Sequence, residues 1–354
     1  MYEGKKDFPR TSQLLKEWTT GNKPLLPGVA VLVQHRGEVR FEQAAGFARF
    51  SPAVSATTEN IWSVASISKP VSAVAIMQLV EAGDISLDQP VVELLPEFGP
   101  GKERVLLRHL LTHSSGIPDN WPELAITQQK GMVEAIGAMD LLFEPGTACS
   151  YCSPGFDLFG AIIQRCSGLD FVEYTESCIL KPLGMRESSF RPPSAWHERI
   201  PTVYDPQGGD KVWPNDPRFV ELGSPAAGLF STLRDLAAFG QAFLNGGEGL
   251  ISQDTHRQML TLHTPGLRDM EGNPQSWGLG WYLNRDNRPR RTAEGLSQSA
   301  YMHGGATSTW LAVDPEHELV LVQLANRFGA EQEATQQKQD SLVEAVLQDL
   351  SAVP

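Results

Sequence analysis

The chain has no run of about 18 or more apolar residues, the length that a bilayer-spanning helix needs. Its first ten residues, Met1 to Arg10, are polar and carry both charge signs, so they do not resemble the apolar core of a secretory signal. We therefore expect a protein that does not cross a membrane and that works in the cytoplasm.

Positive charge is also scarce. The 29 Lys and Arg residues stand against 42 Asp and Glu residues, which gives a formal net charge of -13. A nucleic-acid partner requires clustered Lys and Arg, and an anionic membrane surface repels an acidic chain. We expect neither nucleic acid nor membrane as a partner, and the sequence leaves the oligomeric state open.

Cysteine is rare, with four residues in 354, namely Cys149, Cys152, Cys166 and Cys178. The Cys149-x-x-Cys152 pair has no second Cys or His pair at the spacing of a zinc site. His109 and His113 stand four residues apart, but no Glu lies between them, so packing is favoured over metal binding. We predict reduced core thiols, no metal and no cofactor.

Several common catalytic motifs are missing. The sequence contains no Gly-x-Ser-x-Gly, which excludes the nucleophile turn of α/β-hydrolases. It also lacks His-Glu-x-x-His, the phosphate-binding Gly-x-x-x-x-Gly-Lys and the dinucleotide-binding Gly-x-Gly-x-x-Gly. Zinc peptidases, P-loop enzymes and Rossmann dehydrogenases are therefore disfavoured.

The elements that are present follow a clear order along the chain. Apolar, β-branched runs predict strands over residues 29–34, 39–45, 277–283, 300–303, 309–313 and 319–324. Helical patterns cover residues 11–18, 66–82, 104–113, 155–166, 171–180, 229–245 and 337–350. Strands at both ends predict an α+β fold with one antiparallel sheet assembled from the two termini and flanked by helices. We expect residues 8–82 and 225–354 to form this sheet domain, and residues 83–224 to form a mostly helical inserted domain.

The strongest local signal is Ser66-Ile67-Ser68-Lys69, at the start of an apolar helix that ends before Gly83. Residues three apart on a helix are neighbours, so the Ser66 hydroxyl and the Lys69 ammonium can meet. Pro70 cannot donate to a carbonyl four residues back, which places the helix start close to Ser66. There the helix dipole favours negative charge developing at the serine.

Downstream motifs turn this weak pattern into a specific one. Tyr151-Cys152-Ser153 and His303-Gly304-Gly305 follow in order, and Leu110 to Pro118 reads Leu-Leu-Thr-His-Ser-Ser-Gly-Ile-Pro. Together these segments resemble the Ser-x-x-Lys, Tyr-x-Asn and Lys-Thr-Gly motifs of class C β-lactamases, serine DD-peptidases (penicillin-binding proteins) and their esterase and aminopeptidase relatives. Further landmarks of that family extend the resemblance over about residues 27–326. These are Pro182-Leu183-Gly184-Met185, Ala227-Gly228-Leu229, Trp277-Gly278-Leu279-Gly280-Trp281 and Asn326.

The resemblance implies a β-lactamase/transpeptidase-like fold and a role for each motif residue. Ser66 would attack a carbonyl, with Lys69 and Tyr151 as the two candidates for the base and Tyr151 relaying a proton to the leaving group. Backbone amides of Ser66 and Ala306 would hold the oxyanion. The resemblance further places Asn120, Ser153, His303, Gly304 and Gly305 against the substrate.

Two departures from the family pattern point away from β-lactam hydrolysis. Ser153 stands where penicillin-hydrolysing members usually have Asn, and a hydroxyl cannot reproduce the paired donor and acceptor of an amide. His303 stands where they have Lys, so the fixed positive charge for a substrate carboxylate is weakened at neutral pH. We therefore expect a serine hydrolase that forms an acyl-enzyme on small ester, amide or peptide substrates.

Two alternatives stay open at this stage. One is a β-lactamase or DD-peptidase, and the other is a catalytically silent ligand-binding module of the same fold. Trp62, Trp121 and Trp277 line an aromatic substrate cleft in one interpretation and belong to the core in another. The loops over residues 119–131 and 203–216 are expected to set substrate choice.

Overall fold

The two ends of the chain meet in one antiparallel sheet. In the computed structural model, which describes residues 8–120, 131–285, 293–329 and 332–352, the strand order is β3-β2-β1-β9-β8-β7-β6. The strands are β1 (Gly28–His35), β2 (Glu38–Phe50), β3 (Ala53–Ser55), β6 (Tyr282–Leu283), β7 (Tyr301–Gly305), β8 (Thr309–Asp314) and β9 (Leu319–Ala325). The first and last long strands pair directly, with Val29 opposite Ala325. The predicted sheet from both termini is therefore confirmed.

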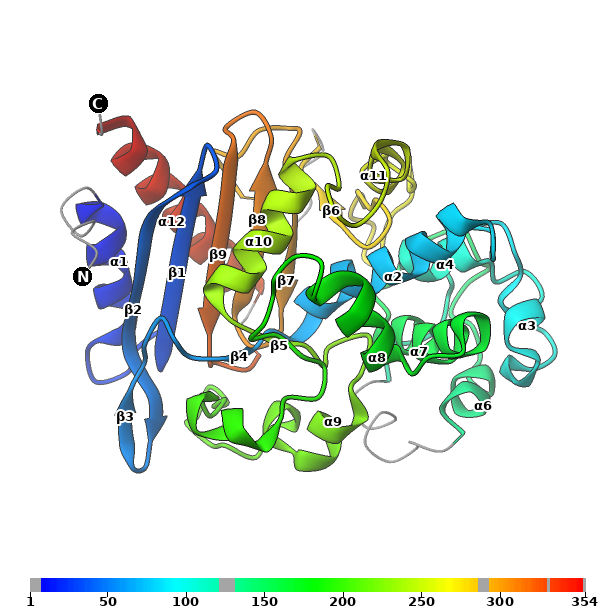
Figure 1. The fold of residues 1–354 in the computed structure, drawn as a ribbon, viewed down its shortest axis with the longest axis horizontal. Coiled ribbons are helices and arrows are strands. Elements are labelled where there is room, and N and C mark those ends of the chain that lie inside the picture. The colour runs from blue at the N-terminus through cyan, green and yellow to red at the C-terminus, as the bar shows by residue number, and fades with distance from the viewer. Residues whose placement is uncertain (1–7, 121–130, 286–292, 330–331, 353–354) are drawn as a thin grey trace.

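Helices cover both faces of this sheet (Figure 1). On one face α1 (Pro9–Thr19) and α12 (Gln332–Ala352) pack together over a core that includes Val31, Met302 and Trp310. On the other face α10 (Leu233–Leu244) crosses the strands and joins a larger core. Because successive strand residues point to opposite faces, β1 and β9, which are buried on both sides, consist mostly of apolar residues, with Gln34 and Gln323 as buried polar exceptions.

The remaining helices lie beside the sheet (Figure 1). Most of them come, in the sequence, after β4 (Trp62–Ser63) and before β5 (Phe230–Ser231), and these two short strands pair with each other. The helices are α2 (Ser68–Ala82), α3 (Val91–Leu94), α4 (Leu107–Leu111), α6 (Met132–Gly137), α7 (Ser153–Ser167), α8 (Phe171–Thr175) and α9 (Pro217–Leu222), with α11 (Gln253–Met259) following α10. The described residues of this part also form short 3₁₀-helices and one π-helix: η2 (Ala65–Ile67), η3 (Pro96–Phe98), the π-helix η4 (Glu176–Leu180), η5 (Ser194–Arg199) and η6 (Trp213–Asn215). One hydrophobic core runs from Leu32 of the sheet to Phe156 of α7, so the division at residues 83 and 224 stays a prediction.

The largest differences from the sequence-based expectation are at three elements. The strand expected over residues 277–283 is confined to β6, because Gly278 to Trp281 forms a tight turn closed by the Gly278 amide and the Trp281 carbonyl, 2.9 Å apart. The helix expected over residues 104–113 shrinks to α4, and the one expected from residue 229 begins only at Leu233, after β5. Turn chemistry and strand pairing override the helical pattern in these places.

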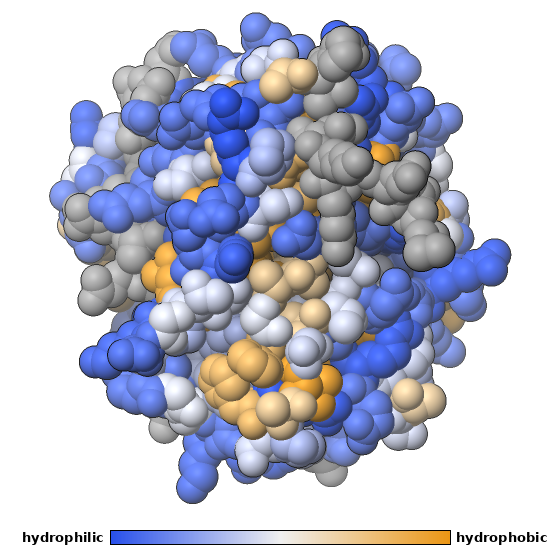
Figure 2. Space-filling view, turned by 90° about the vertical axis from the view of Figure 1, so that its left-hand side faces the viewer, coloured by the Kyte–Doolittle hydropathy of each residue, from blue (hydrophilic) through white to orange (hydrophobic). Residues whose placement is uncertain are grey.

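The outer edge of the sheet, at β2 and β3, is mostly hydrophilic. Figure 2 faces this edge and shows an apolar area toward the lower end, the level at which β3 lies in Figure 1. Phe47 and Phe50 of β2 are exposed where β2 pairs with β3, and the Phe50 ring packs on Tyr204 at 4.6 Å between centroids.

No helix of the described residues, the 21-residue α12 included, has the length and apolar character that a bilayer crossing requires.

Candidate active site

Ser66 lies in a tight turn just before α2. From Asn60 to Met77 it is the one residue that is not buried, and it faces a cavity. The turn is the η2 segment Ala65–Ile67, and α2 starts at Ser68, so the helix begins two residues later than the Ser66 start that Pro70 predicts. Ala65 has a φ of 47°, a left-handed conformation that costs a non-glycine residue about 1–3 kcal/mol. The backbone is thus held in a strained shape immediately before the candidate nucleophile.

Side chains from the far end of the sequence hold this turn. The Thr307 hydroxyl donates to the Ser63 carbonyl at 2.8 Å, and the Thr309 hydroxyl donates to the Val64 carbonyl at 2.9 Å. Gly305 makes the approach possible, because a Cβ there would lie 2.3 Å from the Val64 oxygen. The β7–β8 turn, which contains Ala306, is therefore fastened directly to the backbone that leads into Ser66.

Lys69 is fully buried, and its amine reaches the Ser66 hydroxyl. The Nζ atom lies 3.1 Å from Ser66 Oγ, 3.3 Å from Ser153 Oγ and 3.0 Å from the Ala226 carbonyl oxygen. An ammonium has three donors and no acceptor, so these three contacts match its full capacity. Spacing on the helix predicts this Ser66–Lys69 contact, and Ser153 joins it from the start of α7.

A buried carboxylate stands behind this amine. Asp157 Oδ1 accepts hydrogen bonds from the Ser224 hydroxyl at 2.6 Å and from the Ala226 amide at 3.2 Å. The Ala226 carbonyl is in turn the one that Lys69 binds. Asp157 therefore orients the peptide that positions the lysine, a link that no sequence motif indicated.

Tyr151 arrives from the segment before α7 and lies against the lysine. Lys69 Nζ is 4.7 Å from the centre of the Tyr151 ring. The His113 ring stacks on the phenol at 4.4 Å between centroids, and His113 Nδ1 accepts from the Cys152 amide at 3.0 Å. His113 thus positions Tyr151, while His109 Nδ1 accepts from the Leu106 amide at 3.2 Å. Both histidines use Nδ1 for backbone contacts, in line with the packing role that the sequence favours.

The cavity at Ser66 has a volume of about 380 Å³. The residues that line it on the nucleophile's side are Ser66, Tyr151, Trp277, Tyr282, His303 and Ala306. The structure thus brings together Ser66, Lys69, Tyr151, Ser153, His303 and the Gly304–Ala306 turn. Of the three tryptophans, Trp277 lines the cavity, Trp62 is 1% exposed in the main core, and Trp121 lies outside the described residues.

Asn120 is not brought to this cavity. It is exposed, and it is absent from the lining formed by the described parts of the chain. Its neighbour Asp119 makes the contact instead, because Asp119 Oδ1 accepts from the Ser153 amide at 2.8 Å. The loop segment therefore reaches the site through a carboxylate that supports the start of α7.

The His303 ring is 3% exposed and faces the same space. Its Nδ1 lies 2.8 Å from the Gly304 carbonyl oxygen, and a carbonyl can only accept, so Nδ1 carries a proton. In the neutral ring Nε2 is then the acceptor. The ring centroid is 6.3 Å from that of Tyr151 and 6.0 Å from that of Trp277. His303 therefore stands beside the phenol rather than apart from it.

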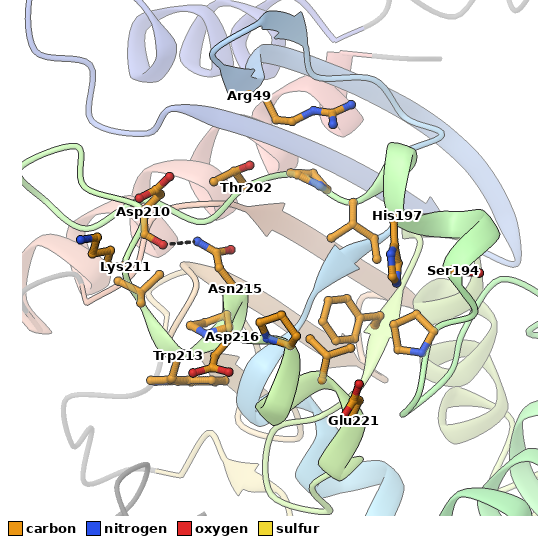
Figure 3. Close-up of a pocket in the computed structure, with 18 of the residues that line it drawn as sticks. Arg49, Ser194, His197, Thr202, Asp210, Lys211, Trp213, Asn215, Asp216 and Glu221 are labelled. Atoms are coloured by element: carbon orange, nitrogen blue, oxygen red, sulfur yellow. Dashed lines mark hydrogen bonds between the residues drawn. The ribbon is translucent and has the colours of Figure 1, made fainter. Parts of the chain in front are cut away.

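A second, larger cavity of about 1030 Å³ shares no lining residue with the first. Figure 3 shows its wall, with Arg49 on one side, Lys211 and Trp213 on another, and His197 on a third. It takes in much of the 203–216 loop. Arg49 is paired with Glu198 at 3.2 Å and Arg191 with Asp170 at 3.1 Å, so these two charges of the lining are already partnered. Nothing in this cavity matches the serine–lysine contact at Ser66.

The cysteines are free, and two of them are deeply buried. Burial raises the pKa of both Cys149 and Cys152 to about 12, so their thiols stay protonated at neutral pH. Cys166 and Cys178 are half-buried. At about pH 8 we expect Ellman's reagent to titrate two thiols of the native protein and all four in guanidinium chloride. Rapid titration of all four in the native protein would contradict the burial of the Cys149–Cys152 segment.

Comparison with known proteins places these observations in a family context. The family model for Beta-lactamase matches residues 20–344. The chain is 26% identical over 315 residues to Protein flp of Staphylococcus aureus (strain N315), covering 85% of this chain and 60% of that protein. It is 26% identical over 329 residues to Penicillin-binding protein 4* of Bacillus subtilis (strain 168), covering 87% and 70%. The chain thus spans about 60% of the length of the first of these curated relatives.

Solved structures confirm the fold class. EstCE1, described as a hydrolase with promiscuous acyltransferase activity, superposes with a TM-score of 0.80 at 21% identity over 96% of this chain and 99% of that one. At that identity the likeness concerns the fold. The predicted α+β arrangement of the β-lactamase/transpeptidase type is therefore correct.

Proposed function

Because the chain belongs to the Beta-lactamase family, we propose that it is a serine hydrolase that works through an acyl-enzyme on Ser66. One observation carries this proposal: the buried Lys69 amine lies 3.1 Å from the hydroxyl of Ser66, the one partly exposed residue of its segment. A nucleophile within hydrogen-bond reach of a base, with the base oriented by further groups, is the arrangement that activates serine. Here Ser153 and the Ala226 carbonyl orient the amine.

The contacts favour Lys69 over Tyr151 as the group that takes the serine proton. Lys69 Nζ is already hydrogen-bonded to Ser66 Oγ, and as a neutral amine it would offer a lone pair along that contact. Tyr151, whose ring centre lies 4.7 Å from Lys69 Nζ, would then pass the proton to the leaving group. The resulting order is attack by Ser66, proton transfer through Lys69 and Tyr151, and hydrolysis of the acyl-enzyme by water.

Two backbone amides are proposed to hold the oxyanion, those of Ser66 and Ala306. Support comes from the hydrogen bonds that tie Thr307 and Thr309 to residues 63 and 64, because these bonds fix the two amides relative to each other. The Ala306 carbonyl is held as well, accepting from the Gly329 amide at 2.9 Å. A donor pair that does not have to reorganise stabilises a developing charge most effectively.

The proposed substrates are small esters, amides or peptides. Ser153 Oγ accepts a hydrogen bond from Lys69, and His303 Nδ1 donates to the Gly304 carbonyl. A hydroxyl and a neutral imidazole in these positions do not supply the amide and the ammonium of the penicillin-hydrolysing pattern. The alternative is a β-lactam or a D-Ala-D-Ala peptide, in keeping with the name of the relative Penicillin-binding protein 4*. No nucleic acid or membrane is proposed as a partner.

A labelling experiment and a substrate panel test these proposals together. A fluorophosphonate probe should add once to the protein, and peptide mass mapping should place the adduct on Ser66. Initial rates should be higher on p-nitrophenyl butanoate than on a chromogenic cephalosporin or a D-Ala-D-Ala peptide. Efficient turnover of the cephalosporin alone would show a β-lactamase, and absence of any adduct would show a silent binding module.

A further inference from the structure

The cavity at Ser66 does not end at β7 but continues around it. Ser66, Tyr151 and His303 line one side, while Met302, Trp310 and Gln323 line the other, on the face that α12 covers. Gly304 lies at the crossing, and a Cβ there would meet nothing closer than 3.7 Å. The absence of a side chain at Gly304 leaves the two halves joined. A small molecule at Ser66 can therefore extend over the strand toward α12.

The amine of Lys338 lies in the part of this cavity that α12 lines. Lys338 of α12 lines it and is 4% exposed, yet it makes no hydrogen bond or ion pair with any described residue. Burial, helped by the positive charge of Arg327, lowers the pKa of Lys338 to about 8. No carboxylate in the described part of the chain offsets these effects. Within the described residues, the positive charges of Lys338 and Arg327 therefore repel each other without a carboxylate to offset them, an arrangement that an anion would stabilise.

Further polar atoms around the amine also lack partners within the described structure. The Ser308 hydroxyl and Gln323 Oε1 are buried without a hydrogen bond, although Gln323 Nε2 donates to the Ser308 carbonyl at 2.9 Å. The Gln339 side chain, 7% exposed, faces the cavity as well. Unsatisfied buried polar groups cost about 1–3 kcal/mol each, so several in one cavity indicate a place for a polar ligand. The larger cavity differs, since two of its arginines are already paired.

We propose that Lys338 binds a carboxylate of the substrate whose scissile carbonyl lies at Ser66, so that the preferred substrates are small anionic esters or amides. This inference rests on the proposed function of Ser66 and adds a substrate class to it. A carboxylate fits the single amine and the 380 Å³ volume, and the Ser308 hydroxyl can donate to it. His303, on one face of β7, does not provide a fixed positive charge for a substrate carboxylate. In this proposal Lys338 of α12 provides the charge from the other face.

Matched substrate pairs test the charge requirement. Mono-p-nitrophenyl glutarate and p-nitrophenyl pentanoate differ by a carboxylate in place of a methyl group on the acyl chain. The esters 3-carboxyphenyl butanoate and phenyl butanoate differ by a carboxylate in place of a ring hydrogen on the leaving group. In at least one pair, Lys338→Met should lower kcat/KM for the anionic member by about 10- to 100-fold, mainly through KM, and leave the neutral member within about 2-fold. The exposed Lys181→Met variant controls for the loss of one positive charge.

The anionic-to-neutral ratio decides the outcome. If it is the same in wild type and Lys338→Met for both pairs, the proposal is wrong. Fluorophosphonate labelling of Ser66 separates this failure from failure of the proposed function, because the neutral probe does not require Lys338. If the protein is labelled but the ratio is unchanged, only the proposed anion site is wrong. If wild-type protein is not labelled, the proposed hydrolase function is wrong.

Binding can also be measured without turnover, in the Ser66→Ala background. Glutarate should raise the melting temperature of Ser66→Ala but not that of Ser66→Ala/Lys338→Met. Without glutarate, Lys338→Met should melt no lower than wild type, because it removes a buried charge that has no partner among the described residues. A lower melting temperature together with an equal glutarate shift would assign Lys338 a purely structural role and overturn the proposal.

Discussion

Replacing Ser66 by alanine and Lys69 by methionine should each lower kcat/KM for p-nitrophenyl butanoate by on the order of 10⁴-fold or more. The double variant should be no slower than the slower of the two single variants. The reason is the direct Nζ–Oγ contact of 3.1 Å: the amine acts only through the hydroxyl that it activates. Groups that work as one unit are not additive, so the second substitution removes nothing further.

Stopped assays at high enzyme concentration measure the residual rates, and the melting temperature of each variant shows that it is folded. Ser177→Ala and Lys181→Met, both exposed and remote in sequence from the motifs, are the matched controls. A Lys69→Met variant that keeps more than about a tenth of the wild-type rate would remove the lysine from the mechanism. Multiplicative losses in the double variant would mean that the two residues act in separate steps.

Gly305→Ala should lower kcat for the same ester by about 100- to 1000-fold, the range expected when an oxyanion donor is misplaced. A Cβ at residue 305 would lie 2.3 Å from the Val64 carbonyl oxygen and 2.2 Å from Thr309 Oγ1. One of these atoms is backbone, so β7 has to move away from the Ser66 turn, and the Thr309–Val64 hydrogen bond breaks. The free energy of unfolding should fall by about 1–3 kcal/mol.

Steady-state kinetics and thermal melting of Gly305→Ala check this expectation. Gly304→Ala is the comparison, because its Cβ meets no atom closer than 3.7 Å and its losses should be much smaller on the neutral ester. Equal effects at the two glycines would show that the close approach to Val64 does not position the site. Wild-type kcat in Gly305→Ala would contradict the role given to the β7–β8 turn.

Much of the sheet could be predicted because its central strands consist mostly of apolar residues. Residues 29–34 and 319–324 lie at its centre and are buried on both faces, so their pattern has little competition from other structures. Residues 277–283 misled the prediction, since Gly278 and Gly280 fold that apolar stretch into a turn. Gly280 has a φ of 79°, and a Cβ there would lie 2.4 Å from the Ala73 Cβ. Such a contact depends on a helix two hundred residues away and leaves no local signal.

In the candidate site, too, contacts between residues close in sequence could be predicted, and contacts between distant residues could not. The Ser66–Lys69 contact follows from helical spacing alone. The placement of Tyr151 and His303 required the family resemblance, because the fold rather than the spacing brings them near Ser66. His113 and Asp119 act through partners that only the structure reveals, and the burial of Lys338 in the cavity is likewise visible only there. Lys338 in particular sits in a helix rich in polar residues, where a lysine is ordinarily a solvated side chain.

The hydrogen bonds from Thr307 and Thr309 to residues 63 and 64 span 244 and 245 residues of sequence. During translation, the backbone at Ser66 has therefore left the ribosome long before the hydroxyls that hold its strained turn are made. β1 is likewise synthesised long before β9, the strand with which it pairs. Nascent chains that end before β8 should carry an intact Ser-x-x-Lys sequence but remain inert, and the proposed reactivity of Ser66 should appear only once β8 and β9 have been synthesised.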